Sequence, residues 1–204
     1  MNKSQIVAHR GYWTEGLKPN SIDALLEALN RGWSIEFDIR YHKDKIVIQH
    51  DLPSTHSEYE KLTTLLKMLP RLKDDQLLFI NIKCDELHDE LKNILHNLDN
   101  YVLFDLSIPH LIKCSINGLK CLNRQSEYEL GASELDKITV GTWYDGFIKT
   151  EIPLDYSKDR INVLVSPELH NRSLPDVSSI CEFASQNNFY ICTDKPLKYE
   201  SSNF

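Results

Sequence analysis

Eight short apolar runs, most of them separated by helical patterns, limit the folds open to this chain more than any other feature. Strands that alternate with helices favour a parallel sheet, and eight strands are the number that closes a (β/α)₈ barrel. At 204 residues and 41% hydrophobic, the chain can bury one core, so we expect a single domain over 1–204. The expected strands cover residues 5–8, 35–39, 77–83, 101–104, 119–122, 138–143, 161–165 and 189–192.

The weakest part of this pattern lies between Asp145 and Arg160, where no periodic helix is visible. A doubly wound open sheet therefore stays open as an alternative. Elsewhere the helix signals are clear. Ser21 precedes a helical run of apolar residues that Gly32 ends, and Ser107 precedes a second one that Gly118 ends.

Two Ser/Glu pairs and one aspartate predict where three other helices begin. Ser57 with Glu60 has the spacing of a capping box, in which two side chains satisfy the first backbone N–H groups of a helix. Ser126 with Glu129 suggests a short helix by the same spacing, and Asp176 is expected to cap a late one.

Two carboxylates stand on one side of an otherwise apolar strand, at Glu36 and Asp38. Alternate residues of a strand share a face, so these side chains point the same way with Cα atoms roughly 7 Å apart. Burying such a pair is costly unless a positive charge lies between its members, and oxygen ligands suit Mg²⁺ or Ca²⁺. A pair of charges on a solvated strand face is the alternative interpretation.

Polar residues collect where the expected strands end, which in a barrel is the face of the catalytic loops. A lone histidine is more often structural than catalytic, but His9 and His50 flank the carboxylate pair within His-Arg-Gly and His-Asp sequences. Other strand ends carry Asn81, Lys83, Asp105, Arg124, Asp145, Glu168 and Asp194.

These side chains fit the hydrolysis of a phosphodiester. A divalent cation on the two carboxylates would draw charge from a phosphoryl oxygen. Arg10 and Lys83 would hold the other oxygens, and His9 and His50 would share the proton transfers. Imidazole suits this duty because its ordinary pKa of about 6.5 lies near working pH.

Several motifs follow one another over nearly the whole chain: Ala8-His9-Arg10-Gly11, Pro19-Asn20-Ser21, Ile35-Glu36-Phe37-Asp38-Ile39, His50-Asp51 and Thr193-Asp194-Lys195-Pro196. Together and in this order they resemble the glycerophosphodiester phosphodiesterase family. The resemblance implies a (β/α)₈ barrel, one divalent cation (Mg²⁺ or Ca²⁺), and a reaction of lipid metabolism. It also implies acid–base roles for His9 and His50, phosphate contacts from Arg10 and Lys83, and metal ligation by Glu36 and Asp38.

The chain also departs from that family. Asn81 stands where the family has a third metal carboxylate. An amide oxygen can ligate a hard cation, but it contributes less charge than a carboxylate. An equal alternative is that the Asn81 side chain only hydrogen-bonds to the backbone at the strand end. An arginine-rich segment after the His-Asp motif is missing, and a late strand reads Leu164-Val165-Ser166-Pro167-Glu168-Leu169-His170. A short bacterial subgroup with an N-I-K strand is similar in these respects.

Two alternatives follow from the departures. The barrel could be catalytically silent and bind a phosphorylated ligand or partner. It could also cleave by internal attack of a neighbouring hydroxyl, which gives a cyclic phosphate. His170 and Arg172 are candidates for the substrate side of the pocket. Structural roles are expected for Asp105, Arg124, Glu168 and Asp194, and surface positions for His42, His56, His88 and His96.

Composition excludes one class of partner, and the partner expected from the site residues is a small-molecule phosphodiester. A formal net charge of −7 and a pI near 5.6 argue against nucleic acid. Five cysteines without a CxxC pair predict reduced, mostly buried thiols and hence a cytoplasmic protein. We also expect no signal peptide and no transmembrane segment, since no apolar run is long enough. The sequence gives no indication of the oligomeric state.

Overall fold

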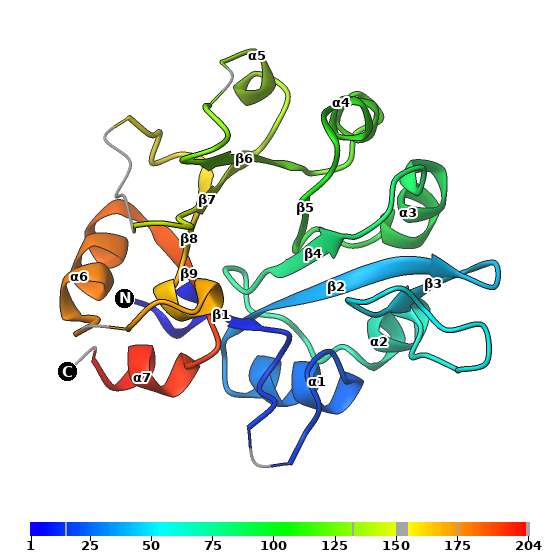
Figure 1. The fold of residues 1–204 in the computed structure, drawn as a ribbon, viewed down its shortest axis with the longest axis horizontal. Coiled ribbons are helices and arrows are strands. Elements are labelled where there is room, and N and C mark those ends of the chain that lie inside the picture. The colour runs from blue at the N-terminus through cyan, green and yellow to red at the C-terminus, as the bar shows by residue number, and fades with distance from the viewer. Residues whose placement is uncertain (15, 132, 150–154, 175, 203–204) are drawn as a thin grey trace.

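Eight parallel strands form a nearly closed barrel, with the helices outside it (Figure 1). The computed structural model describes residues 1–14, 16–131, 133–149, 155–174 and 176–202. The barrel strands are β1 (Ile6–His9), β2 (Ser34–His42), β4 (Leu78–Ile82), β5 (Tyr101–Phe104), β6 (Leu122–Ser126), β7 (Gly141–Asp145), β8 (Ile161–Val165) and β9 (Phe189–Thr193).

The strand order is β5-β4-β2-β1-β9-β8-β7-β6, and its two ends meet at β5 and β6. One parallel bridge joins Leu103 to Cys121 there, and the Leu103 amide donates to the Lys120 carbonyl over 2.8 Å. This seam makes the sheet a barrel, so the predicted (β/α)₈ architecture is confirmed and the open doubly wound sheet is excluded.

Strand β3 (Lys45–Ile48) is not one of the eight barrel strands. It pairs antiparallel with β2 through a tight turn at Lys43 and Asp44, both of which have positive φ. The hairpin extends β2 beyond the barrel and carries the chain to His50.

The helices pack their apolar faces on the outer surface of the barrel. In α1, Ser21 caps the first turn by accepting from the Ala24 amide (3.2 Å), and Gly32 follows the end with φ +92°, as expected. The helices are α1 (Ile22–Asn30), α2 (Leu62–Met68), α3 (His88–Leu95), α4 (Ile108–Ile116), α5 (Ser133–Asp136), α6 (Ser178–Asn187) and α7 (Pro196–Ser201), with 3₁₀ turns η1 (Lys3–Gln5) and η2 (Pro167–His170).

Two expected helix starts are wrong. The Glu60 carboxylate does not close a box with Ser57; it accepts the Ile22 amide of α1 over 2.6 Å, and α2 begins after Lys61 without a side-chain cap. Ser126 ends β6 and forms a turn with Glu129, because β6 runs over Leu122–Ser126 and not over 119–122. In the first case a tertiary partner takes the carboxylate that local spacing assigned to a cap. In the second case the Ser126 hydroxyl does accept from the Glu129 amide (3.1 Å), but this bond closes a turn and no helix follows it directly.

The last helical cap and the long connection agree better with expectation. Asp176 accepts from the Ser178 amide (3.1 Å) and hydroxyl (2.7 Å) at the start of α6. Between β7 and β8 the described residues form no helix, and the segment 150–154 of this connection lies outside the described residues. Ser107 caps α4 with Pro109 in the first turn, as predicted.

Successive strand residues are buried on opposite sides of the sheet, which divides the core in two. Ile35, Phe37 and Ile39 of β2 belong to the layer between strands and helices, whereas Val7 and Phe79 belong to the layer inside the barrel. Since alternate residues face opposite sides, Glu36 and Asp38 face the barrel interior. The inner core is Val7, Phe79, Val102, Phe104, Leu122, Trp143, Val163, Val165 and Cys192.

The expected burial of the cysteines and the expected exposure of His88 have different outcomes. All five cysteines are free and four are buried, with Cys84 half-buried. His88 was expected on the surface, but it is 8% exposed and packs edge to face on His110 with ring centroids 6.1 Å apart. His110 belongs to helix α4, so α4 buries His88 of α3. The sequence pattern of α3 alone cannot predict this contact.

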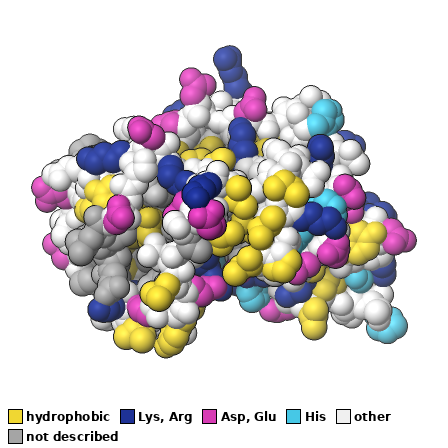
Figure 2. Space-filling model, turned by 90° about the horizontal axis from the view of Figure 1, so that it is seen from above, with side chains coloured by type: hydrophobic (Ala, Val, Ile, Leu, Met, Phe, Trp, Pro, Cys, Tyr) yellow, Lys and Arg dark blue, Asp and Glu magenta, His cyan; other side chains and the backbone are white. Residues whose placement is uncertain are grey.

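Hydrophobic side chains also gather on the face that carries α4 (Figure 2). Ile108, Ile112 and Ile116 are all exposed there, at a spacing of four residues that places them on one side of the helix. The opposite side of α4 packs Leu111 and Cys114 into the core. No helix of the described residues is long and apolar enough to cross a bilayer.

Candidate active site

The register of neighbouring strands brings the predicted residues to one end of the barrel. His9 at the end of β1 pairs with Glu36, and Asp38 pairs with Asn81 of β4. Side chains at paired positions of parallel strands share a face, so all four point inward. The inner positions that hold apolar residues lower in the barrel hold acids, amides and imidazoles at its carboxyl end.

A cavity of about 270 Å³ occupies this end of the barrel. Five of the seven predicted site residues line it: His9, Arg10, Glu36, Asn81 and Lys83. The other lining residues are Phe104, Asp105, Arg124, Trp143, Asp145, Phe147, Val165, Leu169 and His170.

The His-Arg-Gly turn places the first imidazole and the first cation. Arg10 (φ +57°) and Gly11 (φ +82°) are both left-handed. A Cβ on Gly11 would lie 2.6 Å from the backbone carbon of Ala24, so only glycine lets this turn pack on α1. The Arg10 amide then donates to Glu36 Oε2 over 3.2 Å, and its Nε lies 3.1 Å from Asp38 Oδ2.

His9 is held by two carboxylates. Its Nδ1 donates to Asp194 Oδ1 over 2.7 Å, and its Nε2 lies 3.8 Å from Glu36 Oε2. Burial alone would lower the pKa of His9, but the charge of Glu36 and the hydrogen bond to Asp194 outweigh it, so the pKa is raised. Asp194 was expected to be only a structural strand end, and the structure shows it orienting His9.

Glu36 and Asp38 are both 1% exposed. Burial, and next the nearby charge of Asp38, raise the pKa of Glu36 to about 7. Asn20 fixes Asp38 twice: its Nδ2 donates to Asp38 Oδ2 (2.8 Å), and its Oδ1 accepts the Asp38 amide (3.1 Å). These bonds explain why the Pro-Asn-Ser motif accompanies the acidic strand.

Three buried oxygens at this end of the barrel have no hydrogen-bond partner among the described residues: Glu36 Oε1, Asn81 Oδ1 and Asp38 Oδ1, the last with Lys83 Nζ at 3.5 Å. Buried acceptors are nearly always satisfied, so three together indicate a group that they ligate. Two carboxylates and an amide are oxygen ligands of the kind that Mg²⁺ and Ca²⁺ use, and they fit a hard divalent cation. Among the described residues, no group of three or more His, Cys, Asp or Glu side chains could hold a metal, so the third oxygen beside the two carboxylates is that of an amide, Asn81.

Lys83 and Arg124 continue the site around the barrel. Lys83 Nζ lies 3.0 Å from Asp105 Oδ2 and 3.5 Å from Asp38 Oδ1. Arg124 contacts Asp105 and also binds both oxygens of Glu129, at 2.6 and 3.0 Å. Asp105 and Arg124 thus have the ion-paired role expected for them, and Lys83 reaches both the cavity and Asp38.

His50 is placed differently from the other predicted residues. It follows β3, its side chain is 42% exposed, and its Nδ1 donates to Asp51 Oδ1 over 2.8 Å. Its carbonyl accepts from Arg40 Nε (2.7 Å), and the preceding Gln49 amide donates to the Asp38 carbonyl (2.9 Å). His50 therefore stands beside the acidic strand, outside the lining of the cavity.

The far wall of the cavity holds a second imidazole–carboxylate pair. His170 Nε2 donates to Asp145 Oδ1 over 2.5 Å, and the His170 ring packs on Phe147 with centroids 4.4 Å apart. Burial raises the pKa of Asp145, against the bond from His170. Next to this pair, Trp143 stacks on Phe104 at 3.9 Å. The sequence predicts His170 on the substrate side, but the residues between Asp145 and His170 carry no signal that connects the two.

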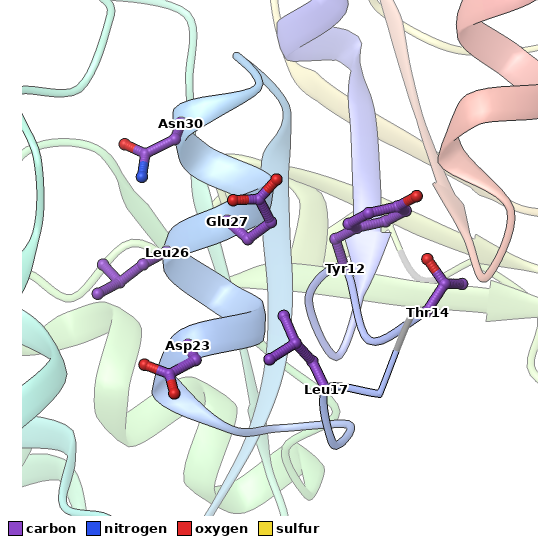
Figure 3. Close-up of a pocket in the computed structure, with 7 residues that line it drawn as sticks. All are labelled: Tyr12, Thr14, Leu17, Asp23, Leu26, Glu27 and Asn30. Carbon is purple, nitrogen blue, oxygen red and sulfur yellow. The ribbon is translucent and has the colours of Figure 1, made fainter.

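A larger cavity of about 340 Å³ lies outside the barrel, between α1 and the loop after β1 (Figure 3). Its walls are Tyr12, Thr14, Leu17, Asp23, Leu26, Glu27 and Asn30, and none of these is a predicted site residue. The described residues that line it include no histidine, lysine or arginine, so the barrel cavity is the candidate active site.

Fold and cavity together define a (β/α)₈ barrel with acids, imidazoles and cations at the carboxyl ends of its strands. No protein-family model matches the chain, and no curated protein matches it. Among solved structures, it resembles the glycerophosphodiester phosphodiesterases of Thermotoga maritima (17% identity, TM-score 0.70) and Agrobacterium tumefaciens (15%, 0.67); each likeness covers 98% of this chain and 99% of the other.

A third similar structure is a phosphodiesterase of Oleispira antarctica in complex with the product sn-glycerol-3-phosphate (13% identity, TM-score 0.64, covering 97% of this chain and 96% of the other). Identities this low establish the fold alone. The resemblance that the motifs indicated is thus confirmed at the level of the whole barrel.

Proposed function

We propose that this protein hydrolyses a phosphodiester, of the glycerophosphodiester kind, with a divalent cation at Glu36, Asp38 and Asn81. The observation that carries the proposal is the set of three unsatisfied buried oxygens in a cavity that also contains His9, Arg10 and Lys83. The fold supports it, since three enzymes that cleave phosphodiesters share this barrel and one of them holds a phosphomonoester product.

The cations of the chain bind the substrate phosphate in this proposal. Arg10 and Lys83 line the cavity and already lie beside Asp38, so a phosphoryl group there meets positive charge on two sides. A bound Mg²⁺ or Ca²⁺ would polarise a phosphoryl oxygen and stabilise charge in the transition state. Because the chain is acidic overall, this local cluster has to supply the attraction.

The imidazoles move the protons. His9, oriented through Nδ1 by Asp194, presents Nε2 toward Glu36 and the cavity. We assign His9 and His50 as the acid–base pair: one accepts the proton of the attacking water, and the other donates to the departing alkoxide. Hydrolysis then yields a phosphomonoester and an alcohol. The exposed His50 ring has to turn inward from Asp51 to reach a substrate.

Turnover tests the assignment directly. We expect wild type to hydrolyse glycerophosphodiesters or bis(p-nitrophenyl) phosphate when supplied with Mg²⁺, Ca²⁺ or Mn²⁺. His9→Ala and His50→Ala should each reduce kcat by about 10²-fold or more. His96→Ala, at the exposed end of α3, is the matched control and should leave turnover unchanged. Full activity in both site variants would refute the assignment of roles.

A catalytically silent barrel that binds a phosphorylated ligand is the second candidate. Asn81 favours it, because an amide contributes no charge to the cation site, as does the pairing of Asp38 with Arg10 and Lys83. Thermal melting that rises with phosphate and cation, without turnover of any diester, would select this candidate. A melting curve insensitive to millimolar Mg²⁺ and Ca²⁺ would count against the ion site itself.

Internal attack by a substrate hydroxyl is a third version of the chemistry, and a cyclic phosphate among the products identifies it.

We place the reaction in the cytoplasm, a proposal that the five free thiols support.

A further inference from the structure

His170 and Asp145 lie across the barrel from the candidate cation site. Asp145 ends β7, and β7 is four strands away from β2 in the order β2-β1-β9-β8-β7, which in an eight-stranded barrel is the opposite side. A phosphodiester whose phosphate lies at Glu36 therefore extends one of its alcohols toward β7 and β8. This half of the cavity meets the alcohol, not the phosphate.

That half is mostly apolar. Trp143 stacked on Phe104 forms one wall, and Val165, Leu169 and Phe147 complete the apolar surface. Such walls pack against carbon and exclude water, so an unpaired polar atom beside them discriminates strongly between substrate alcohols.

Of the polar groups that line the cavity near this surface, Asp105 and Arg124 are ion-paired with each other and Asp145 binds His170, whereas Nδ1 of His170 has no such bond to a described residue. Because Nε2 donates its hydrogen to Asp145, the neutral ring has a lone pair at Nδ1 and accepts hydrogen bonds there. Nδ1 has no hydrogen bond to the described residues, and it is not among the nitrogens buried from solvent. The His170 side chain is 19% exposed and lines the cavity, so this acceptor is open to a ligand.

The ring is also fixed in place, as a selective acceptor must be. Phe147 packs on it from one side. The 3₁₀ turn that carries His170 is anchored by Glu168, which binds the hydroxyls of Ser166 and Thr193 and the amide of Asp194 (3.2 Å). Asn171 ends the turn with φ +57°.

We propose that His170, held by Asp145, is a specificity-determining residue that accepts a hydrogen bond from a free hydroxyl on the substrate alcohol. The substrate is the diester already proposed above; what is new is that the arm carrying the hydroxyl lies against Trp143 and Phe147 and is selected by His170. This inference rests on the proposed function, and it adds the selection of the alcohol to it.

Two diesters that differ only in their hydroxyls test the proposal: p-nitrophenyl 2,3-dihydroxypropyl phosphate and p-nitrophenyl propyl phosphate. Wild type should prefer the first by about 10- to 100-fold in kcat/KM, the cost of leaving a buried polar group unpaired. His170→Phe should abolish the preference by slowing the dihydroxypropyl ester alone. His170→Gln, which restores an acceptor, should recover part of it, and His56→Phe on an exposed loop is the control.

Binding separates this inference from the proposed function. Calorimetry with glycerol 3-phosphate and propyl phosphate, in saturating Mg²⁺, should show the same preference in wild type and its loss in His170→Phe. If wild type hydrolyses neither ester, the proposed function fails, and the two affinities still decide the role of His170. Equal affinities in wild type, or an equal loss for both ligands in His170→Phe, would overturn the inference.

Discussion

At the scale of single residues, Glu36 is a carboxyl group almost fully withdrawn from water. Burial, and next the charge of Asp38, raise its pKa to about 7, and one of its oxygens has no hydrogen-bond partner among the described residues. A divalent cation would remove both penalties at once. The metal-free protein should therefore have a lower free energy of unfolding than the cation-bound protein, because of the surroundings of Glu36.

The sign of that instability follows from proton linkage. Between pH 4.5 and about 7 the folded protein keeps the Glu36 proton that the unfolded chain has released, so unfolding becomes easier as pH rises. The raised pKa of His9 acts in the same direction at higher pH, since its contribution is complete below the ordinary value and disappears above the raised one. In chelator, we expect the free energy of unfolding to fall by about 3 kcal/mol across this window.

Urea denaturation at pH 5 and pH 7 measures the effect. Glu36→Gln should remove most of the pH dependence, whereas Glu182→Gln on the exposed side of α6 should not change it. Saturating Mg²⁺ or Ca²⁺ should stabilise wild type more at pH 7 than at pH 5, because the ion needs the ionised carboxylate. A wild type that gains stability from pH 5 to 7 in chelator would contradict this account of Glu36.

Asp194 provides a second prediction at this scale. Asp194→Asn keeps the shape of the side chain but removes a charge that raises the pKa of His9. With His9 as the base, the acid limb of the kcat/KM profile should move to lower pH, and kcat should fall by about 10-fold or more as orientation is lost. Asp99→Asn, fully on the surface, is the control, and an unmoved limb would separate Asp194 from His9.

At the scale of elements, strand β7 depends on its first residue. A Cβ on Gly141 would lie 1.8 Å from the Ile161 carbonyl oxygen of β8, a backbone atom that cannot move aside. Gly141→Ala should therefore cost about 3 kcal/mol or more in unfolding free energy. Gly131→Ala meets only the Gln125 side chain and should cost less than about 0.5 kcal/mol. Equal costs in urea denaturation would mean that β7 and β8 can separate locally.

At the scale of the whole molecule, the barrel has a weak closure. Five residue pairs join β2 to β4, but one bridge joins β5 to β6. Local opening begins where few bonds have to break. In native-state hydrogen exchange, the Leu103 amide at the seam should exchange at least about 10-fold faster than the Phe37 amide in β2. Similar protection at both positions would show that the barrel opens only as a unit.

The acidic strand shows how much of the site could be read without a structure. The Glu-x-Asp spacing predicted a shared inward face, and the register His9–Glu36 and Asp38–Asn81 bears this out. The two histidines, by contrast, look alike in sequence, yet His9 lines the cavity and His50 does not. The residues around each histidine predict a catalytic role for both, but the hairpin formed by β2 and β3 decides where the His50 ring lies.

By itself, the sequence determined the number of barrel strands, the inward face of the acidic strand and the end of the barrel where the chemistry lies. These depend on periodicity and on strand ends, which are local properties of the chain. Only the tertiary structure decided that Asp194 orients His9, that Asp145 holds His170, and that Glu60 bonds to α1. Each of those contacts joins residues that are distant along the chain, and their partners are set by closure of the barrel.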